Sequence, residues 1–129
     1  MRWRMHRYLS QAYFEELASL LNADAEFQKK AGSLTTRLLF IVRDRGQAVL
    51  FAVDHGKVSV TMATPEAPAD FVFTGDYATW VTNHRDGVTL EKLIMTGKVK
   101  MKGSIPRILG LKSQLGAVDQ KGRTIPVEY

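Results

Sequence analysis

Hydrophobic side chains change their spacing twice along this chain, and the two changes limit which folds it can adopt. Over residues 10–32 they recur every three or four positions, which predicts amphipathic helices. Over residues 34–62 the period falls to two, and turn sequences at 44–46 and 54–56 divide this stretch into three strands. Turns this short join antiparallel neighbours. The first half of the chain is therefore predicted to form helices followed by a three-stranded meander.

The second half returns to helical spacing after one further strand. Residues 70–74 predict a fourth strand, and residues 77–84 and 90–94 carry the apolar stripes of two helices. Lysine alternates with Val and Met over 98–102, which predicts a fifth strand whose apolar side chains face inward. Residues 104–118 begin with Ser and a first-turn proline and predict one last helix. We therefore expect an α+β domain with a five-stranded, mainly antiparallel sheet covered on one face by helices.

The chain has 129 residues and no cysteine. That length predicts a single domain, with residues 1–8 as a basic leader and residues 120–129 as a tail. The absence of cysteine excludes disulfides, thiolate zinc sites, iron–sulfur clusters and a cysteine nucleophile.

The leader lacks the apolar region of a secretory signal, and no segment has the composition of a membrane span. We therefore expect a cytoplasmic protein.

The formal net charge is +5, and the basic residues gather in the leader, in residues 98–112 and in the tail. A basic protein can bind nucleic acid or an anionic membrane surface. An excess of this size is also typical of an ordinary solvated surface, which is the simpler interpretation. We therefore expect no nucleic acid partner.

The three histidines form no recognisable catalytic or metal-binding pattern. His6 lies in the basic leader, His55 at a turn, and His84 on the apolar side of a predicted helix. No serine or carboxylate stands at a spacing that indicates a triad, and no phosphate-binding loop is present. We therefore predict no catalytic residue, no metal and no cofactor. The alternatives to a non-catalytic function are a small α+β enzyme of isomerase or hydrolase type and a basic surface-binding module.

Binding of an apolar molecule requires none of these groups. Each buried methylene contributes about 0.8 kcal/mol, so apolar contacts alone can hold a hydrocarbon chain. The late helices carry apolar stripes, and the flexible Met95 and Met101 are suited to adapt to a ligand's shape. Ordinary core packing explains the same stripes, and the residues alone favour that explanation.

The segment 86–103 resembles the sterol carrier protein domain, a lipid-binding family. A glycine is followed by a short apolar helix, a Gly-Lys-apolar-Lys-apolar-x-Gly strand and an amphipathic helix, in the order typical of that family. Residues 9–27 resemble the start of its short stand-alone bacterial members, so the similarity spans residues 8–119. The resemblance implies a five-stranded sheet covered by helices, with a hydrophobic tunnel between the two layers.

The resemblance also implies a non-catalytic function, the binding or transfer of a fatty acid, fatty acyl-CoA, phospholipid or sterol-like ligand. By this resemblance, the residues expected to line the tunnel are Trp80, Leu93, Ile94, Met101, Ile108, Leu111 and Leu115. Lys98, Lys100 and Lys102 are expected to meet an anionic headgroup. Besides the lipid, the expected partners are an anionic membrane surface in transient contact or a partner enzyme, and the protein is expected to be a monomer or a homodimer.

Overall fold

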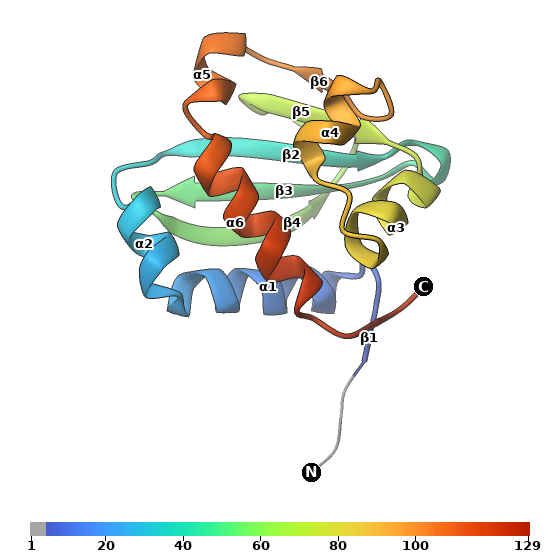
Figure 1. Ribbon diagram of the computed structural model, residues 1–129, viewed down its shortest axis with the longest axis horizontal. Coiled ribbons are helices and arrows are strands. Elements are labelled where there is room, and N and C mark those ends of the chain that lie inside the picture. The colour runs from blue at the N-terminus through green and yellow to red at the C-terminus, as the bar shows by residue number, and fades with distance from the viewer. Residues whose placement is uncertain (1–4) are drawn as a thin grey trace.

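Five strands form the central sheet of the computed structural model, which describes residues 5–129 (Figure 1). Residues 1–4 of the expected basic leader lie outside the described residues. The strand order is β4-β3-β2-β5-β6, and the β2–β5 pair is parallel whereas the other neighbouring pairs are antiparallel. The strands are β2 (Thr36–Val42), β3 (Gln47–Asp54), β4 (Lys57–Ala63), β5 (Phe71–Gly75) and β6 (Lys100–Lys102). The predicted α+β class with a five-stranded, mainly antiparallel sheet is confirmed.

The two faces of the sheet are covered by different parts of the chain. Because side chains alternate along a strand, Leu38 and Phe40 of β2 face the helices, whereas Leu39 and Ile41 face the other way. Residues 64–70 carry the chain from β4 to β5, and their alanines pack against the face that Leu39 and Ile41 occupy. The helix-covered face is therefore the one on which a site between two layers can form.

Helices cover that face of the sheet. Figure 1 shows α6 crossing in front of the strands, α1 running along the lower side of the view, α2 and α3 near the two ends of the strands, α4 near β5 and β6, and α5 at the outer margin of the molecule. The bounds are α1 (Gln11–Ala23), α2 (Ala25–Ala31), α3 (Tyr77–Arg85), α4 (Leu90–Met95), α5 (Ile105–Leu109) and α6 (Lys112–Arg123). Ser10 begins α1 by accepting a hydrogen bond from the Tyr13 N–H at 3.2 Å, and Asp24 caps α2 in the same way. A single 3-10 turn, η1 (Arg43–Arg45), joins β2 to β3.

The last helix is broken in two, contrary to the prediction of one helix over 104–118. α5 ends at Gly110, and α6 starts after Leu111, which is turned into the core and is only 8% exposed. Glycine is a weak helix former, so the burial of a leucine side chain outweighs the loss of helix continuity at this point. The break directs α5 away from the axis of α6.

β6 is shorter than the predicted strand over 98–102. The N–H groups of Lys98 and Val99 donate to the Leu93 carbonyl at 2.9 and 3.0 Å, so they cap the end of α4 and do not pair with a strand. Val99 is nevertheless 1% exposed, and Met101 packs against the core from the same side. The predicted inward direction of both side chains is confirmed.

The two ends of the described chain pair with each other. β1 (His6–Arg7) and β7 (Val127–Glu128) form a parallel two-stranded sheet, in which the Tyr8 N–H donates to the Glu128 carbonyl at 2.9 Å. Ile125 just before β7 is 1% exposed. The segments expected to be a leader and a tail therefore meet beside α1 and α3 and bury part of their length.

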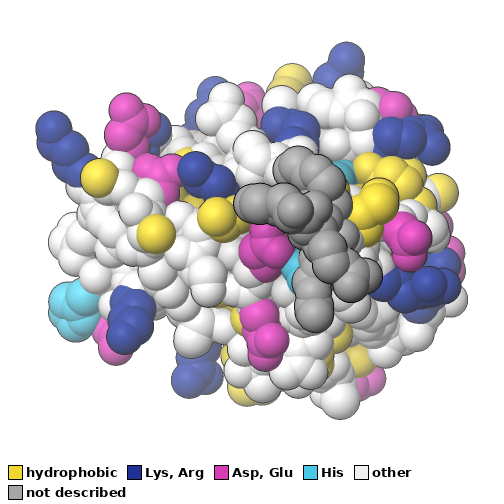
Figure 2. Space-filling model, turned by 90° about the horizontal axis from the view of Figure 1, so that it is seen from below, with side chains coloured by type: hydrophobic (Ala, Val, Ile, Leu, Met, Phe, Trp, Pro, Cys, Tyr) yellow, Lys and Arg dark blue, Asp and Glu magenta, His cyan; other side chains and the backbone are white. Residues whose placement is uncertain are grey.

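Charged side chains of both signs lie on the face of the molecule that is at the bottom in Figure 1. Figure 2 shows Lys and Arg side chains interspersed with Asp and Glu side chains across this face. Mixed charge of this kind keeps a surface solvated without attracting one particular polyanion.

Candidate functional site

A cavity of about 690 Å³ lies between α4, β6, α5 and α6. Nine apolar residues line it: Leu90, Ile94, Met95, Met101, Ile105, Ile108, Leu109, Leu115 and Ala117. Its volume falls within the range of small-molecule sites, and its walls are mainly hydrocarbon. The cavity exists because α5 is displaced from α6 by the break at Gly110, so that no side chain fills the space between the two helices and the β6 edge.

The spacing of residues along β6 and α6 determines which of their side chains line the cavity. Strand alternation turns Met101 of β6 toward the helices and the neighbouring lysines away from them. On α6, Lys112, Gly116 and Gln120 recur at four-residue spacing and line the cavity along one stripe. Gly116 lies in the middle of this stripe, and a Cβ atom added there would meet no atom within 4 Å apart from the adjacent backbone of α6 itself.

Four of the seven residues expected to line a tunnel do line this cavity: Ile94, Met101, Ile108 and Leu115. Trp80 instead lines a second cavity, described below. Leu93 and Leu111 belong to the packed core, where they are 2% and 8% exposed, and line neither cavity. The sequence-based prediction missed the apolar lining residues Leu90, Met95, Ile105, Leu109 and Ala117, because apolar residues three or four apart on a helix are equally typical of core contacts.

The lysines expected at an anionic headgroup do not line the cavity. Lys100 and Lys102 pair with Thr74 and Val72 and alternate with Met101, so they lie on the opposite face of β6, and Lys98 is exposed in the preceding turn. The lysines that do line the cavity are Lys30 of α2 and Lys112 of α6.

Lys112 is paired across the cavity. Its Nζ lies 3.2 Å from Oε1 of Glu91 on α4, and both side chains are more than half exposed. An exposed pair of this kind contributes at most about 1 kcal/mol. It therefore joins α4 to α6 only weakly.

The second cavity is smaller, about 70 Å³, and lies deeper, beneath α1. Aromatic side chains of the core surround it, among them Phe14, Phe40, Phe51 and Trp80. The two cavities share Leu90, Leu115, Asp119 and Arg123 as lining residues, so these four side chains form the partition between them. The empty space between the helices and the sheet is thus divided into a large outer cavity and a small inner one.

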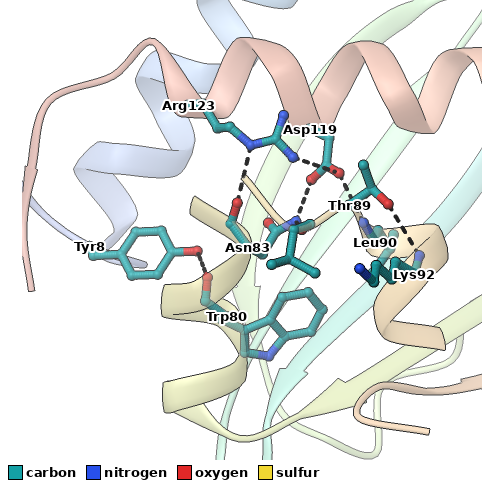
Figure 3. Close-up of polar contacts among 9 residues, drawn as sticks. Tyr8, Trp80, Asn83, Thr89, Leu90, Lys92, Asp119 and Arg123 are labelled. Carbon is teal, nitrogen blue, oxygen red and sulfur yellow. Dashed lines mark hydrogen bonds and ion pairs between the residues drawn. The ribbon is translucent and has the colours of Figure 1, made fainter. Parts of the chain in front are cut away.

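The polar half of the partition is a connected network (Figure 3). Asp119 of α6 accepts hydrogen bonds from Asn83 Nδ2 at 2.8 Å, from the Leu90 N–H at 3.0 Å and from Arg123 Nη2 at 3.3 Å. Arg123 Nε also donates to the Asn83 carbonyl at 3.1 Å. The Asp119 carboxylate therefore holds α6 to the end of α3 and the start of α4, and its oxygens are used in structural contacts.

His84 is enclosed by the C-terminal segment. Its Nε2 lies 2.9 Å from the Gly122 carbonyl and 3.2 Å from the Ile125 carbonyl, so Nε2 carries the proton and donates. Nδ1 then accepts from the hydroxyl of Tyr129. Burial lowers the pKa of His84. A histidine whose two nitrogens are both engaged in this way fastens the C-terminal segment and has no nitrogen free for proton transfer.

The stability of the fold is expected to fall as the pH drops below about 6.5, the ordinary pKa of histidine. Since the pKa of His84 is lowered in the folded state, the unfolded chain binds a proton first, and the free energy of unfolding decreases until the folded state is protonated too. Carboxyl groups with lowered pKa values, such as Asp76 beside Arg43, titrate at more acidic pH than this window.

Urea denaturation at pH 7.5 and pH 5.5 measures the effect. The His84→Gln variant should lose most of the difference between the two pH values. His55→Gln should keep it, because the His55 side chain is 81% exposed at the 54–56 turn. An unchanged pH dependence in His84→Gln would contradict the assignment.

Residues 5–129 contain no group of three or more His, Cys, Asp or Glu side chains placed to hold a metal ion. Nor is any helix among these residues both long and apolar enough to cross a bilayer. The walls of the outer cavity offer mainly apolar contacts, and the charged side chains that line it are Lys30, Glu91, Lys112, Asp119 and Arg123.

Residues 14–115 match the sequence model of the SCP-2 sterol transfer family. The chain belongs to this family. The matched segment runs from α1 into α6, so it includes most of the residues that line the cavity, and the resemblance seen in the sequence is confirmed. A search of curated proteins found no matching sequence.

Solved structures of SCP-2 proteins share the fold. A sterol carrier protein 2 superposes with a TM-score of 0.79 over 92% of this chain and 99% of that chain, at 23% identity. A conserved hypothetical protein from Thermus thermophilus, described as possibly a sterol carrier protein, superposes with a TM-score of 0.83 at 21% identity. The match covers 98% of this chain and 94% of that chain. The sec-alkylsulfatase Pisa1 from Pseudomonas sp. gives 0.55 at 19% identity, over 69% of this chain and 14% of the enzyme's chain.

Proposed function

We propose that this protein binds a lipid in the outer cavity and carries or presents it without reacting with it. The observation that carries the proposal is the cavity of about 690 Å³ with nine apolar lining residues. Membership of the SCP-2 sterol transfer family supports the lipid class. Asp119, a carboxylate that borders the space, is held by structural hydrogen bonds, which favours a carrier over an enzyme.

A hydrocarbon tail accounts for the dimensions and the chemistry of the walls. Burying about fifteen methylenes contributes about 12 kcal/mol. Association and ordering of the ligand cost at least about 4 kcal/mol, which leaves an affinity near the micromolar range. Such an affinity is suited to a carrier, since cargo must also be released.

An anionic headgroup is the second part of the proposed ligand, as in a fatty acid, a phospholipid or a fatty acyl-CoA. Lys112 and Lys30 line the same cavity as the apolar residues, and Lys112 can exchange Glu91 for a ligand carboxylate or phosphate. Lys98, Lys100 and Lys102 lie outside the cavity, so their proposed contribution is to the long-range positive field.

Displacement of a fluorescent fatty acid from delipidated protein tests this function. We expect saturable binding near the micromolar range and competition by unlabelled long-chain fatty acid. Parallel competition by a sterol, a lysophospholipid and an acyl-CoA ranks the headgroups. Absence of saturable binding by all four ligand classes would refute the proposal.

A further inference from the structure

Three large apolar side chains around the outer cavity are exposed to solvent. Met95 at the end of α4 is 79% exposed, and Ile105 and Leu109 of α5 are 58% and 66% exposed. All three also line the cavity, so they form its rim. Ile105 and Leu109 are four residues apart and lie on the same side of α5, a helix with no buried residue. Exposed apolar groups gathered at the opening of a cavity indicate a surface that contacts another apolar phase.

The segment that bears this rim is strongly basic. Residues 92–118 contain six Lys and Arg residues and no Asp or Glu, and Glu91 is the only acidic residue from 87 to 118. Without these six, the chain has 12 Lys and Arg residues against 13 Asp and Glu residues. The entire positive excess of the protein therefore lies on the segment that forms β6, α5 and much of α4 and α6.

Cations also lie next to the apolar rim in the structure. Lys112 lines the cavity with Ile105 and Leu109. Arg107 lies on the opposite side of α5 from those two residues, with its guanidinium 5.5 Å from the centre of the Phe71 ring. Lys92, Lys98 and Arg107 are all exposed. The face shown in Figure 2, by contrast, carries both signs intermixed.

We propose that α5, the end of α4 and the start of α6 form a docking surface for an anionic lipid bilayer. Met95, Ile105 and Leu109 enter the boundary between headgroups and acyl chains, while the surrounding lysines and arginines contact lipid phosphates. The opening of the cavity then faces the membrane, so a lipid tail passes between bilayer and cavity without crossing water. This inference rests on the proposed function for its purpose, but the docking surface is tested separately.

Glu91 is expected to oppose docking to an anionic membrane. Its carboxylate is repelled by an anionic surface, and its partner Lys112 is attracted to that surface. Docking therefore favours separation of the ion pair that joins α4 to α6 across the cavity. Removal of the Glu91 charge should strengthen binding to an anionic bilayer, whereas removal of a nearby cation should weaken it.

Co-sedimentation with vesicles measures docking. Vesicles of phosphatidylcholine alone are compared with vesicles in which about one third of the lipid is phosphatidylglycerol, at low and high salt. We expect binding to the anionic vesicles to be at least tenfold tighter and to weaken with salt. The Lys92→Gln/Arg107→Gln variant should bind about twentyfold more weakly, since one cation near the surface is worth about a factor of five. Glu91→Gln should bind several-fold more tightly.

Matched variants identify the surface. The Ile105→Ser/Leu109→Ser variant should bind the anionic vesicles at least tenfold more weakly than the wild type. Its two serine side chains cannot insert into the boundary between headgroups and acyl chains as Ile105 and Leu109 do. Lys57→Gln, an exposed cation at the distant β3–β4 turn, should bind like the wild type. Equal binding to both kinds of vesicle, or no loss in the Ile105→Ser/Leu109→Ser variant, would overturn the proposal. If sedimentation velocity shows that the wild type is a dimer and this variant a monomer, the surface is an interface between two copies of the chain, and the membrane proposal is overturned.

Ligand binding without vesicles separates this proposal from the proposed function. Lys92 and Arg107 do not line the cavity, so their double variant should bind the fluorescent fatty acid as the wild type does. If no protein binds the fatty acid but vesicle binding depends on α5 as described, the proposed function fails and the docking surface stands. The opposite result, ligand binding with no selectivity for anionic vesicles, removes the docking surface alone.

Discussion

The Gly116→Trp variant is expected to lose at least tenfold of the affinity for a fluorescent fatty acid. Gly116 lies at the middle of the cavity-lining stripe of α6, and a Cβ atom there would have no atom within 4 Å apart from the adjacent backbone of α6 itself. An indole side chain can enter the cavity and displace several methylenes of a ligand, each worth about 0.8 kcal/mol. Displacement of three methylenes already lowers affinity about fiftyfold.

Gly116→Ala is the matched control, because a methyl group occupies little of the cavity. Replacing a helical glycine by alanine should stabilise the protein by up to about 1 kcal/mol. Affinity should stay near the wild-type value, as measured by fluorescence titration. If Gly116→Trp binds the fatty acid as tightly as Gly116→Ala, the ligand lies elsewhere, and the outer cavity is not the binding site.

Asp119→Ala is expected to lower the free energy of unfolding by about 3 kcal/mol. The side chain of Asp119 is only 12% exposed and accepts three hydrogen bonds from three parts of the chain. Alanine leaves the Arg123 guanidinium without its carboxylate partner and leaves the Leu90 N–H and the Asn83 amide short of acceptors.

Asp119→Asn retains the shape and one acceptor oxygen, so its loss should be about half as large. Urea denaturation monitored by tryptophan fluorescence gives both values, since Trp80 lies in the core beside this network. A loss below about 1 kcal/mol in Asp119→Ala would show that α6 is held mainly by its apolar contacts. In that case the network would have little part in separating the two cavities.

Most secondary structure could be predicted because it follows from short-range patterns. The alternation in β2, β3 and β4 and the helical stripe of α1 depend on residues only two to four positions apart. The errors occur at ends and breaks. Val99 follows a strand pattern, yet its N–H caps α4, and Leu111 follows a helical stripe, yet it ends one helix and begins another. In both places a contact with a distant or differently oriented element outweighs the local pattern.

The site was harder to predict than the fold, because an apolar stripe shows only that a side chain avoids water. Leu111 and Leu115 lie on the same stripe, but Leu111 packs into the core and Leu115 borders both cavities. The lysines of β6 illustrate the same limit. The sequence showed that they alternate with Met101 and so face away from it. The helix-covered face of β6 becomes a cavity wall, however, only because of the position of α5.

The sequence alone determined the order of the elements from α1 to β6, the inward direction of Val99 and Met101 and the basic character of residues 92–118, since each depends on neighbours along the chain. The cavity, its partition by Asp119 and Arg123 and the exposed rim of Met95, Ile105 and Leu109 arose only on folding. A cavity is space that packing leaves unfilled, so its existence depends on how α4, α5, α6 and β6 meet in three dimensions.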